Sequence, residues 1–373
     1  MKRIMISLVA CLTTAALPAQ EGGLDIRGSV QDNTVLLQDA EAGDLAYAGY
    51  VRVSLSAQNK DRENAKLDLD ASVSLLYGRY ADAFLAPISA AGFGAVPALN
   101  AAVELDIRKL SLSLYLGPVD LTVGRKIVNW GYGRVFSPAD AYSSIDLGDI
   151  SLRRTGSDLL MAEVYFTDAT GAGLIISPTS DMTGFKAGGK FFTNLLDFDA
   201  SLIGVYRDAE ADLILGTAVK GTVPVLDIGL TMEGIRHIVP EGEDGWFEAM
   251  VGLDYSFFDR VLIVMAEYYF NERPIDAASL SPVELAAVDR AFWGRHYVFG
   301  SAQLVMFDVF VVSASALTNI ETLAAIAALQ LSAGIFDNTF ISGAVRAFSG
   351  DVNSIPGVAG LRLSYGLSIE IRF

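Results

Sequence analysis

The sequence predicts an all-β protein, a transmembrane antiparallel β-barrel of about eighteen strands, from three observations. Residues 361–373, at the end of the chain, alternate between apolar and polar side chains almost without interruption. The chain is 52% hydrophobic, yet its apolar residues are spread over many short segments and do not form the run of about 20 that a spanning helix needs. Tight and long connections also alternate along the chain. A barrel explains all three, because it turns an apolar face to lipid and leaves no strand edge unpaired.

The last strand shows the pattern most clearly. Its odd-numbered positions are apolar and its even-numbered positions are Arg, Ser, Gly and Glu, and side chains of a strand point alternately to its two faces. A strand with a fully apolar face that ends at an aromatic carboxy terminus, Phe373, resembles the closing strand of bacterial outer-membrane β-barrels. This resemblance implies that Phe373 is part of the signal read by the barrel-assembly machinery, and that outer-membrane lipid surrounds the protein.

The amino-terminal residues predict a secretory signal peptide, 1–19. A basic start is followed by the mostly apolar stretch 4–17 and by the small residue Ala19, and the apolar stretch is too short to span a bilayer as a helix. The remaining residues, 20–373, then form a single barrel domain. The segment that ends at Cys11 also fits a lipoprotein cleavage box, so lipidation of Cys11 is the alternative. Cys11 is the only cysteine, and without it the secreted chain would contain no disulfide.

The charge of the chain is acidic. It is −17 over all residues, and removal of residues 1–19 leaves 25 basic against 44 acidic side chains. This balance argues against nucleic acid and against anionic lipid headgroups as partners. It does not identify a substrate, because acidic loops are typical of a solvated surface bridged by cations.

Eighteen segments have strand character, and each is near or above the roughly 9–11 residues that cross a bilayer at a tilt. Sixteen strands is the alternative count. The segments are 24–37, 44–58, 64–77, 100–116, 119–129, 158–167, 171–178, 183–194, 196–208, 210–222, 224–237, 244–256, 260–271, 294–307, 309–319, 321–335, 338–349 and 358–373.

The lengths of the connections separate a barrel from a soluble sandwich. If the first strand starts in the periplasm, the even-numbered connections should be short periplasmic turns and the odd-numbered ones longer extracellular loops. The tight joints, such as Gly117-Pro118, fall on even counts, and the long segments fall on odd counts. These long segments are 79–99, 129–157, 272–293 and 350–357.

Three segments depart from simple alternation. Segment 100–116 changes face at Arg108-Lys109, which predicts a β-bulge there, with a separate turn as the rival. Segment 321–335 alternates little and could be helical by itself, but barrel closure favours a strand. Within 272–293, Ser281, Pro282 and Glu284 form a capping box before a short helix over 282–291, which is expected to cover the barrel mouth rather than to bind a partner.

The most distinctive segment begins at Gly124-Arg125 and continues through Trp130-Gly-Tyr-Gly133 to Phe136-Ser-Pro-Ala-Asp140. It resembles a Gly-Arg…Trp-Gly-x-Gly…Phe-x-Pro-x-Asp segment of bacterial outer-membrane barrels that are grouped as porin-like. The resemblance covers this segment and the general plan of the chain, and it implies no particular substrate.

The loop 129–157 is long and rich in aromatic residues and proline, and loops of this length are usually functional or disordered. If it folds into the lumen, Trp130, Tyr132 and Phe136 would be buried against the wall. Three arginines, Arg134, Arg153 and Arg154, would then cross the pore. The alternative is an external loop whose aromatic residues mark the membrane interface.

Signals for enzymatic chemistry are weak. The two histidines, His237 and His296, are far apart in sequence and have no adjacent nucleophile motif. No phosphate-binding loop or clustered metal ligands occur, so the sequence predicts no catalytic residues, no metal and no cofactor.

The sequence therefore predicts a porin-like channel of the outer membrane for passive diffusion of small solutes, with loop 129–157 as the constriction. Opposing charges would line this constriction. A structural or adhesion barrel with a sealed lumen is the first alternative, and a barrel hydrolase is the second. Solute preference and oligomeric state cannot be derived from the sequence. The predicted constriction residues are Arg125, Arg134, Arg153 and Arg154 on one side and Asp68, Asp70, Glu104 and Asp106 on the other.

Overall fold

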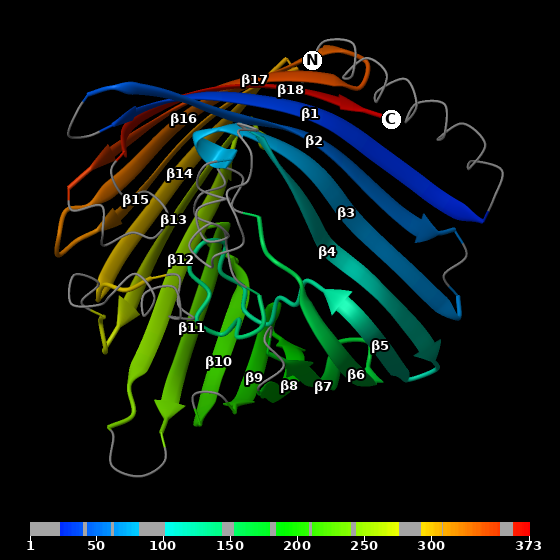
Figure 1. The fold of residues 1–373 in the computed structure, drawn as a ribbon. Coiled ribbons are helices and arrows are strands. Elements are labelled where there is room, and N and C mark those ends of the chain that lie inside the picture. Colours follow the sequence, from blue (N-terminus) through cyan, green and yellow to red (C-terminus); the bar gives the residue numbers. More distant parts are fainter. Residues whose placement is uncertain are drawn as a thin grey trace.

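The protein is a closed ring of eighteen antiparallel strands, in which strands adjacent in sequence are adjacent in the sheet (Figure 1). The first strand pairs with both the second and the last, and this closes the ring. The predicted fold class and the count of eighteen, rather than sixteen, are confirmed. The computed structural model describes residues 23–39, 43–60, 63–81, 101–143, 153–179, 184–208, 211–239, 244–275, 292–307, 309–350 and 361–373.

Of the eighteen strands, all except β5 (Val119–Lys126), which has eight residues, reach the roughly 9–11 residues that cross a bilayer at a tilt. They are β1 (Leu24–Asp39), β2 (Leu45–Asn59), β3 (Ala65–Gly78), β4 (Ala101–Leu116), β5 (Val119–Lys126), β6 (Ser157–Thr167), β7 (Thr170–Pro178), β8 (Phe185–Leu195), β9 (Phe198–Arg207), β10 (Asp212–Val223), β11 (Ile228–Ile238), β12 (Phe247–Phe257), β13 (Leu262–Asn271), β14 (His296–Met306), β15 (Phe310–Asn319), β16 (Ala325–Phe336), β17 (Thr339–Ser349) and β18 (Leu361–Arg372).

The two faces of the sheet follow the alternation predicted from sequence. In β18 the side chain of Leu367 is 56% exposed on the outward face, whereas Ser364 and Ser368 are buried on the inward face. Gln31 of β1 donates a hydrogen bond to the hydroxyl of Ser368 across the closing seam, at 3.0 Å. The apolar face therefore points out of the ring and the polar face lines the lumen.

The ends of the barrel differ in the length of their connections. At one end the strands are joined by tight turns, for example by Leu196 and Asp197, which both have left-handed φ angles of 54° and 66°. Gly117, with φ of 70°, begins the two-residue joint between β4 and β5. The long connections all lie at the other end, as the predicted alternation of turns and loops requires.

Two predictions about irregular segments are confirmed, and several predicted strand boundaries are corrected. Asp70 pairs with Lys109 and Ala71 with Ile107, so Arg108 is the extra residue of a β-bulge in β4. The segment at 321–335 is a strand, β16, but it begins four residues later than predicted, at Ala325. The strand predicted from residue 224 begins later, at Ile228, because the residues before it form the turn from β10.

The outward face also carries polar groups near the first strand. Asp32 of β1 lies between Val51 and Ile369, both outward-facing. The hydroxyl of Tyr77 is 3.1 Å from a carboxylate oxygen of Asp32 and 3.1 Å from the hydroxyl of Thr34. This hydroxyl satisfies part of the hydrogen-bonding capacity of a carboxylate that would otherwise face an apolar surrounding.

Several predicted features lie outside the described residues: the signal peptide 1–19 with Cys11, and the helix 282–291. Within the described ranges, no helix is long and apolar enough to cross a membrane. The same ranges contain no cluster of three or more His, Cys, Asp or Glu side chains arranged to hold a metal ion.

Candidate functional site

The segment that follows β5 turns into the ring of strands, and residues 127–143 lie in the lumen (Figure 1). Two hydrogen bonds hold the ends of this segment together. The hydroxyl of Ser143 accepts one from the backbone N–H of Val128 at 3.0 Å and donates one to the Val128 carbonyl at 2.7 Å. The hydroxyl of Ser157, the first residue of β6, donates to the carbonyl of Tyr142. We call residues 127–143 the lumen loop. The prediction that this segment folds inward is confirmed for these residues.

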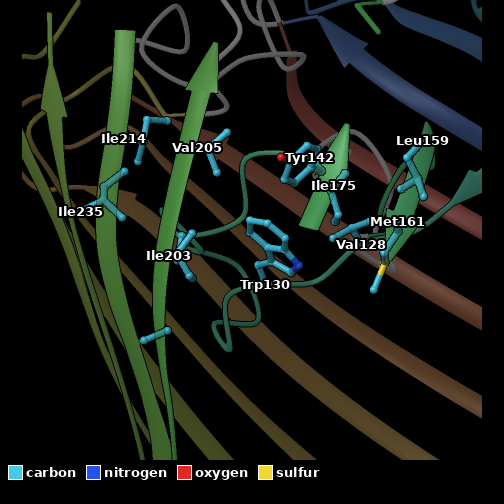
Figure 2. Packing of buried hydrophobic residues seen from close by; sticks show 12 residues of the cluster. Val128, Trp130, Tyr142, Leu159, Met161, Ile175, Ile203, Val205, Ile214 and Ile235 are labelled. Atoms are coloured by element: carbon cyan, nitrogen blue, oxygen red, sulfur yellow. The ribbon is translucent and has the colours of Figure 1, made fainter. Parts of the chain in front are cut away.

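The first half of the lumen loop packs on the wall through Trp130. Its indole is 4% exposed and lies in one buried cluster with Ile203 and Val205 of β9, with Tyr142 edge-on at 5.0 Å between ring centroids (Figure 2). Apolar residues at lumen-facing positions are unusual for a polar-lined barrel. Here they form the surface that receives the loop.

The second half of the lumen loop is fixed by Phe136, which is fully buried. Its ring stacks on Tyr269 of β13 at 5.4 Å and meets Phe292 edge-on at 4.7 Å. Tyr297 of β14 completes the cluster. Aromatic pairs of this kind add to the free energy gained by burial alone.

A buried carboxylate on β11, Glu233, accepts hydrogen bonds from three backbone N–H groups of the lumen loop. The donors are Tyr132 at 2.5 Å, Gly133 at 2.7 Å and Ala139 at 3.0 Å. The hydroxyl of Ser137 donates to the same carboxylate at 3.2 Å. Hydrogen bonds to an ionised acceptor are stronger than neutral ones. Glu233 therefore fixes, at one point of the wall, the loop residues on both sides of the loop tip.

A second buried carboxylate, Glu267 of β13, holds the tip of the lumen loop. It accepts from the backbone N–H groups of Arg134 at 2.6 Å, Val135 at 2.9 Å and Phe136 at 3.0 Å. Six backbone N–H groups of one loop therefore donate hydrogen bonds to two carboxylates of the wall. Buried backbone donors need an acceptor, and the loop has no regular secondary structure to supply one.

The two glycines of the Trp-Gly-x-Gly motif are required by this close approach. A Cβ atom on Gly131 would lie 2.0 Å from the Ser137 hydroxyl oxygen and 2.6 Å from Glu233. A Cβ atom on Gly133 would lie 1.8 Å from the carbonyl oxygen of Phe136. The motif thus allows the loop backbone to reach the carboxylate, since any side chain would displace it.

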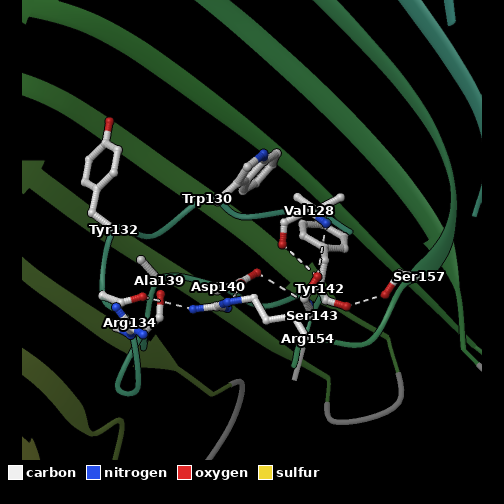
Figure 3. A network of polar contacts seen from close by, with 12 residues as sticks. Val128, Trp130, Tyr132, Arg134, Ala139, Asp140, Tyr142, Ser143, Arg154 and Ser157 are labelled. Carbon is white, nitrogen blue, oxygen red and sulfur yellow. Dashed lines mark hydrogen bonds and ion pairs between the residues drawn. The ribbon is translucent and has the colours of Figure 1, made fainter. Parts of the chain in front are cut away.

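An ion pair between Asp140 and Arg154 ties the lumen loop to the residues that precede β6 (Figure 3). Arg154 further donates to the carbonyl of Gly133 at 3.0 Å. Burial raises the pKa of Asp140 to about 7, although the neighbouring Arg154 acts to lower it. The guanidinium of Arg154 is therefore paired with groups of the lumen loop.

The structure contradicts the predicted place of Arg125 in the pore. Arg125 pairs in the sheet with Leu110 and Asp158, and Leu110 is 50% exposed on the outward face. Its guanidinium donates to both carboxylate oxygens of Asp158, at 2.9 and 2.5 Å. Gly124, with φ of 114°, precedes it at an irregular point of β5. The prediction was wrong because sequence spacing alone does not fix the face at the end of a strand.

The other predicted cations have different surroundings. Arg134 has an exposed side chain at the tip of the lumen loop, and its guanidinium has no hydrogen bond or ion pair to any described residue. Arg153 lies next to Arg154 and is half-buried. Only Arg134 among these residues is presented to the lumen as an uncompensated charge.

The four predicted acidic residues occupy lumen-facing positions of β3 and β4, on the wall opposite the anchored loop. Asp68 forms an ion pair with Lys66 at 3.3 Å, and Asp70 one with the bulge residue Arg108 at 3.5 Å. The same wall carries Glu104 and Asp106. The loop makes its hydrogen bonds and ring contacts instead with β6, β8, β11, β13 and β14.

A cavity of about 400 Å³ lies between the start of the lumen loop and the wall. Its charged lining comes from Lys126, Glu163, Lys190 and Asp199. Sequence reasoning placed no functional residue here, and it also missed the two anchoring carboxylates. The alternation of polar residues in β6, β8, β11 and β13 indicates which side chains face the lumen. It does not indicate which lumen carboxylates bind the loop, because a carboxylate with a structural partner has the same sequence pattern as a solvated one.

The histidines are engaged in contacts other than those of a nucleophile–base pair. His237 contacts Asp212 through Nδ1 at 2.9 Å and Glu248 through Nε2 at 3.1 Å. His296 contacts the hydroxyl of Tyr268 at 2.7 Å. In the described part of the chain, neither imidazole reaches a serine hydroxyl.

The carboxy-terminal Phe373 lies on the outward face, beside the first strand. Its backbone exchanges two hydrogen bonds with Gly28, at 2.8 and 2.9 Å. A Cβ atom on Gly28 would lie 2.5 Å from the Phe373 ring, so the ring covers this glycine. The terminal aromatic is thus part of the seam that closes the barrel.

Comparison with solved structures shows the same barrel fold in bacterial outer-membrane channels. Pseudomonas aeruginosa OccK2, solved in complex with glucuronate, has a TM-score of 0.58 at 10% identity, with 94% of this chain and 98% of that chain covered. P. aeruginosa OpdK, solved with vanillate, has a TM-score of 0.58 at 9% identity, with 94% and 98% covered. Acinetobacter baumannii OccAB1 has a TM-score of 0.55 at 8% identity, with 94% and 96% covered. No protein-family model and no curated protein matches the sequence.

Proposed function

We propose that this protein is a porin-like channel of the bacterial outer membrane through which small solutes diffuse passively. The observation that carries the proposal is the lumen loop, held inside the barrel by Glu233 and Glu267. A loop that is anchored at two points to a polar-lined wall narrows the pore. The fold agrees, since solved channels with small-molecule ligands have the same architecture.

The structure supports a revised set of constriction residues. Arg134 supplies the exposed positive charge on the loop, while Asp68, Asp70, Glu104 and Asp106 supply negative charge from β3 and β4. Such an arrangement produces a transverse field in a narrow pore, where screening by salt is weak. Arg153 remains a candidate at the base of the loop. Arg125 is left out because the register places it on the outward face, and Arg154 because it is held by Asp140 and by the carbonyl of Gly133.

The proposal includes the orientation and the surroundings of the barrel. The end with tight turns faces the periplasm and the end with long loops faces the exterior, as is general for outer-membrane barrels. Outer-membrane lipid contacts the outward apolar face, and the assembly machinery reads the strand that ends at Phe373. The signal peptide 1–19 directs the chain across the inner membrane.

The proposal is tested by reconstituting the purified protein in planar lipid bilayers. Discrete steps of ionic current are expected, and Arg134→Gln should shift the reversal potential in a salt gradient toward cation selectivity. Lys66→Gln on the opposite wall, which removes a cation already paired with Asp68, is the matched control and should shift it less. A barrel that inserts but passes no current would favour the alternative, a structural or adhesion barrel with a sealed lumen.

A further inference from the structure

We infer that the cavity beneath the lumen loop is a binding site for a small zwitterion, a solute that carries one ammonium and one carboxylate group beside an apolar body. This inference rests on the proposed channel function and specifies which solutes that channel favours. The cavity measures about 400 Å³, within the range of roughly 300–1,000 Å³ that is typical of small-molecule sites.

The sheet places opposite charges at one level of the cavity wall. Glu163 of β6 and Lys190 of β8 are both register partners of Gly173 on the strand between them. Neighbouring strands are about 4.8 Å apart, so the two backbones are separated by about 10 Å. Because Gly173 has no side chain, β7 places no group between the two charges at this level; a Cβ atom there would come into ordinary van der Waals contact with Glu163 Cγ, at 3.4 Å.

Two of the charged groups in the cavity lack direct partners. Within the described residues, neither Lys126 nor Glu163 forms a hydrogen bond or an ion pair, although each lies within the electrostatic range of the other. Lys190 is partly engaged, since its ammonium donates to the carbonyl of Trp130 at 3.1 Å and lies 5.3 Å from the centre of the Tyr132 ring. A solute with both charges can pair with Lys126 and Glu163 at once, and such charge-assisted hydrogen bonds are the strong ones.

The whole lining of the cavity favours a solute that has no net charge and that carries an apolar body. The cationic Lys126 and Lys190 balance the anionic Glu163 and Asp199, so a solute with only one charge leaves one sign uncompensated. The rest of the surface is largely aromatic or apolar and can hold a ring by burial and stacking. These residues are Val128, Trp130, Tyr132, Met161, Tyr165 and Phe192.

The test uses three solutes of nearly the same size at pH 7: phenylalanine, 3-phenylpropionate and 2-phenylethylamine. The first is a zwitterion, the second lacks the ammonium group and the third lacks the carboxylate. Each is added to single channels of the full-length mature protein in potassium chloride, and the frequency and duration of current interruptions are recorded. Phenylalanine is expected to interrupt the current at a concentration about tenfold or more below the other two, since loss of one charged contact is worth at least 1.4 kcal/mol, or a factor of ten.

Two variants assign the contacts. Lys126→Gln should remove the advantage of phenylalanine over 2-phenylethylamine, and Glu163→Gln its advantage over 3-phenylpropionate. Lys66→Gln on β3, outside the cavity, should leave the order of the three solutes unchanged. Equal interruption by all three solutes, or a preference for phenylalanine that persists in both variants, would overturn the inference while the channel itself stands. Absence of any potassium chloride current would instead overturn the proposed function.

Discussion

Replacing Glu233 by alanine is expected to release the first half of the lumen loop without unfolding the barrel. The carboxylate accepts three backbone N–H groups and one hydroxyl, and alanine accepts none. The barrel keeps its strand pairing on both sides of β11, because those bonds do not involve the side chain. The tip of the loop stays attached through Glu267.

The cost of the substitution follows from the number and kind of bonds lost. Hydrogen bonds to a charged group contribute about 1.5–3 kcal/mol each, but four bonds to one carboxylate are not additive and water in the lumen replaces part of them. Removal of one member of a buried charged network costs about 3–5 kcal/mol. We therefore expect the free energy of local loop opening to fall by about 3–5 kcal/mol in Glu233→Ala, and by less in Glu233→Gln, which keeps one acceptor.

Hydrogen exchange measured by mass spectrometry reads this opening directly, because protected amides exchange only when their bonds open. Amides of Tyr132, Gly133 and Ala139 should exchange about a hundredfold to several-thousandfold faster in Glu233→Ala, since each 1.4 kcal/mol is a factor of ten. Asp254→Asn is the control, as this carboxylate also faces the lumen but makes no hydrogen bond in the described ranges. Unchanged exchange at the three amides would refute the anchoring role of Glu233.

Three further predictions concern charge, membrane contact and assembly. Below pH 7, Asp140 should become neutral, because burial raises its pKa to about 7. The positive charge of its partner, Arg154, is then no longer balanced, so the anion selectivity of the channel should rise as the pH falls from 8 to 6. Asp140→Asn should abolish this dependence on pH. Since this pKa is raised, deprotonation disfavours the folded loop, so the contribution of Asp140 to loop stability should fall as the pH rises from about 4 to 7. Leu367→Arg on the outward face should cost about 2–4 kcal/mol in urea unfolding of the lipid-embedded barrel, and Ser364→Arg on the inward face much less; equal costs would show that the faces are misassigned. Deletion of Phe373 should lower the amount of barrel at the cell surface, measured by antibody labelling, and an undiminished amount would remove its role in assembly.

The barrel was predictable from the sequence because its physical requirement is local. Each spanning strand must alternate, and a break in alternation such as that at Arg108 must be compensated by a bulge, which the structure contains. Boundaries were less predictable: the turn before Ile228 is apolar and was assigned to the strand. An apolar residue in a turn at the membrane surface has the same sequence pattern as the end of a strand.

The site was predictable only in part, because it depends on contacts between distant segments. The aromatic and glycine content of the lumen loop indicated that it folds inward. The partners of that loop, Glu233 and Glu267, are about a hundred residues further along the chain and resemble other lumen carboxylates in sequence. The exclusion of Arg125 depends on the register at the end of β5, and that of Arg154 on its ion pair with Asp140; no local pattern specifies either.

The single-channel conductance of a loop-excised barrel tests most directly the claim that the lumen loop sets the width of an open pore. Residues 130–141 can be replaced by two glycines, because the hydrogen bonds between Val128 and Ser143 already hold the ends of the loop together. The excised barrel should conduct in larger steps than the unmodified protein. Excision removes one cation, Arg134, and one anion, Asp140, but it uncovers two carboxylates, Glu233 and Glu267, against one arginine, Arg154, so the selectivity should be more strongly cationic. Steps of unchanged size and selectivity would contradict the account, because the loop would then lie outside the path of the ions.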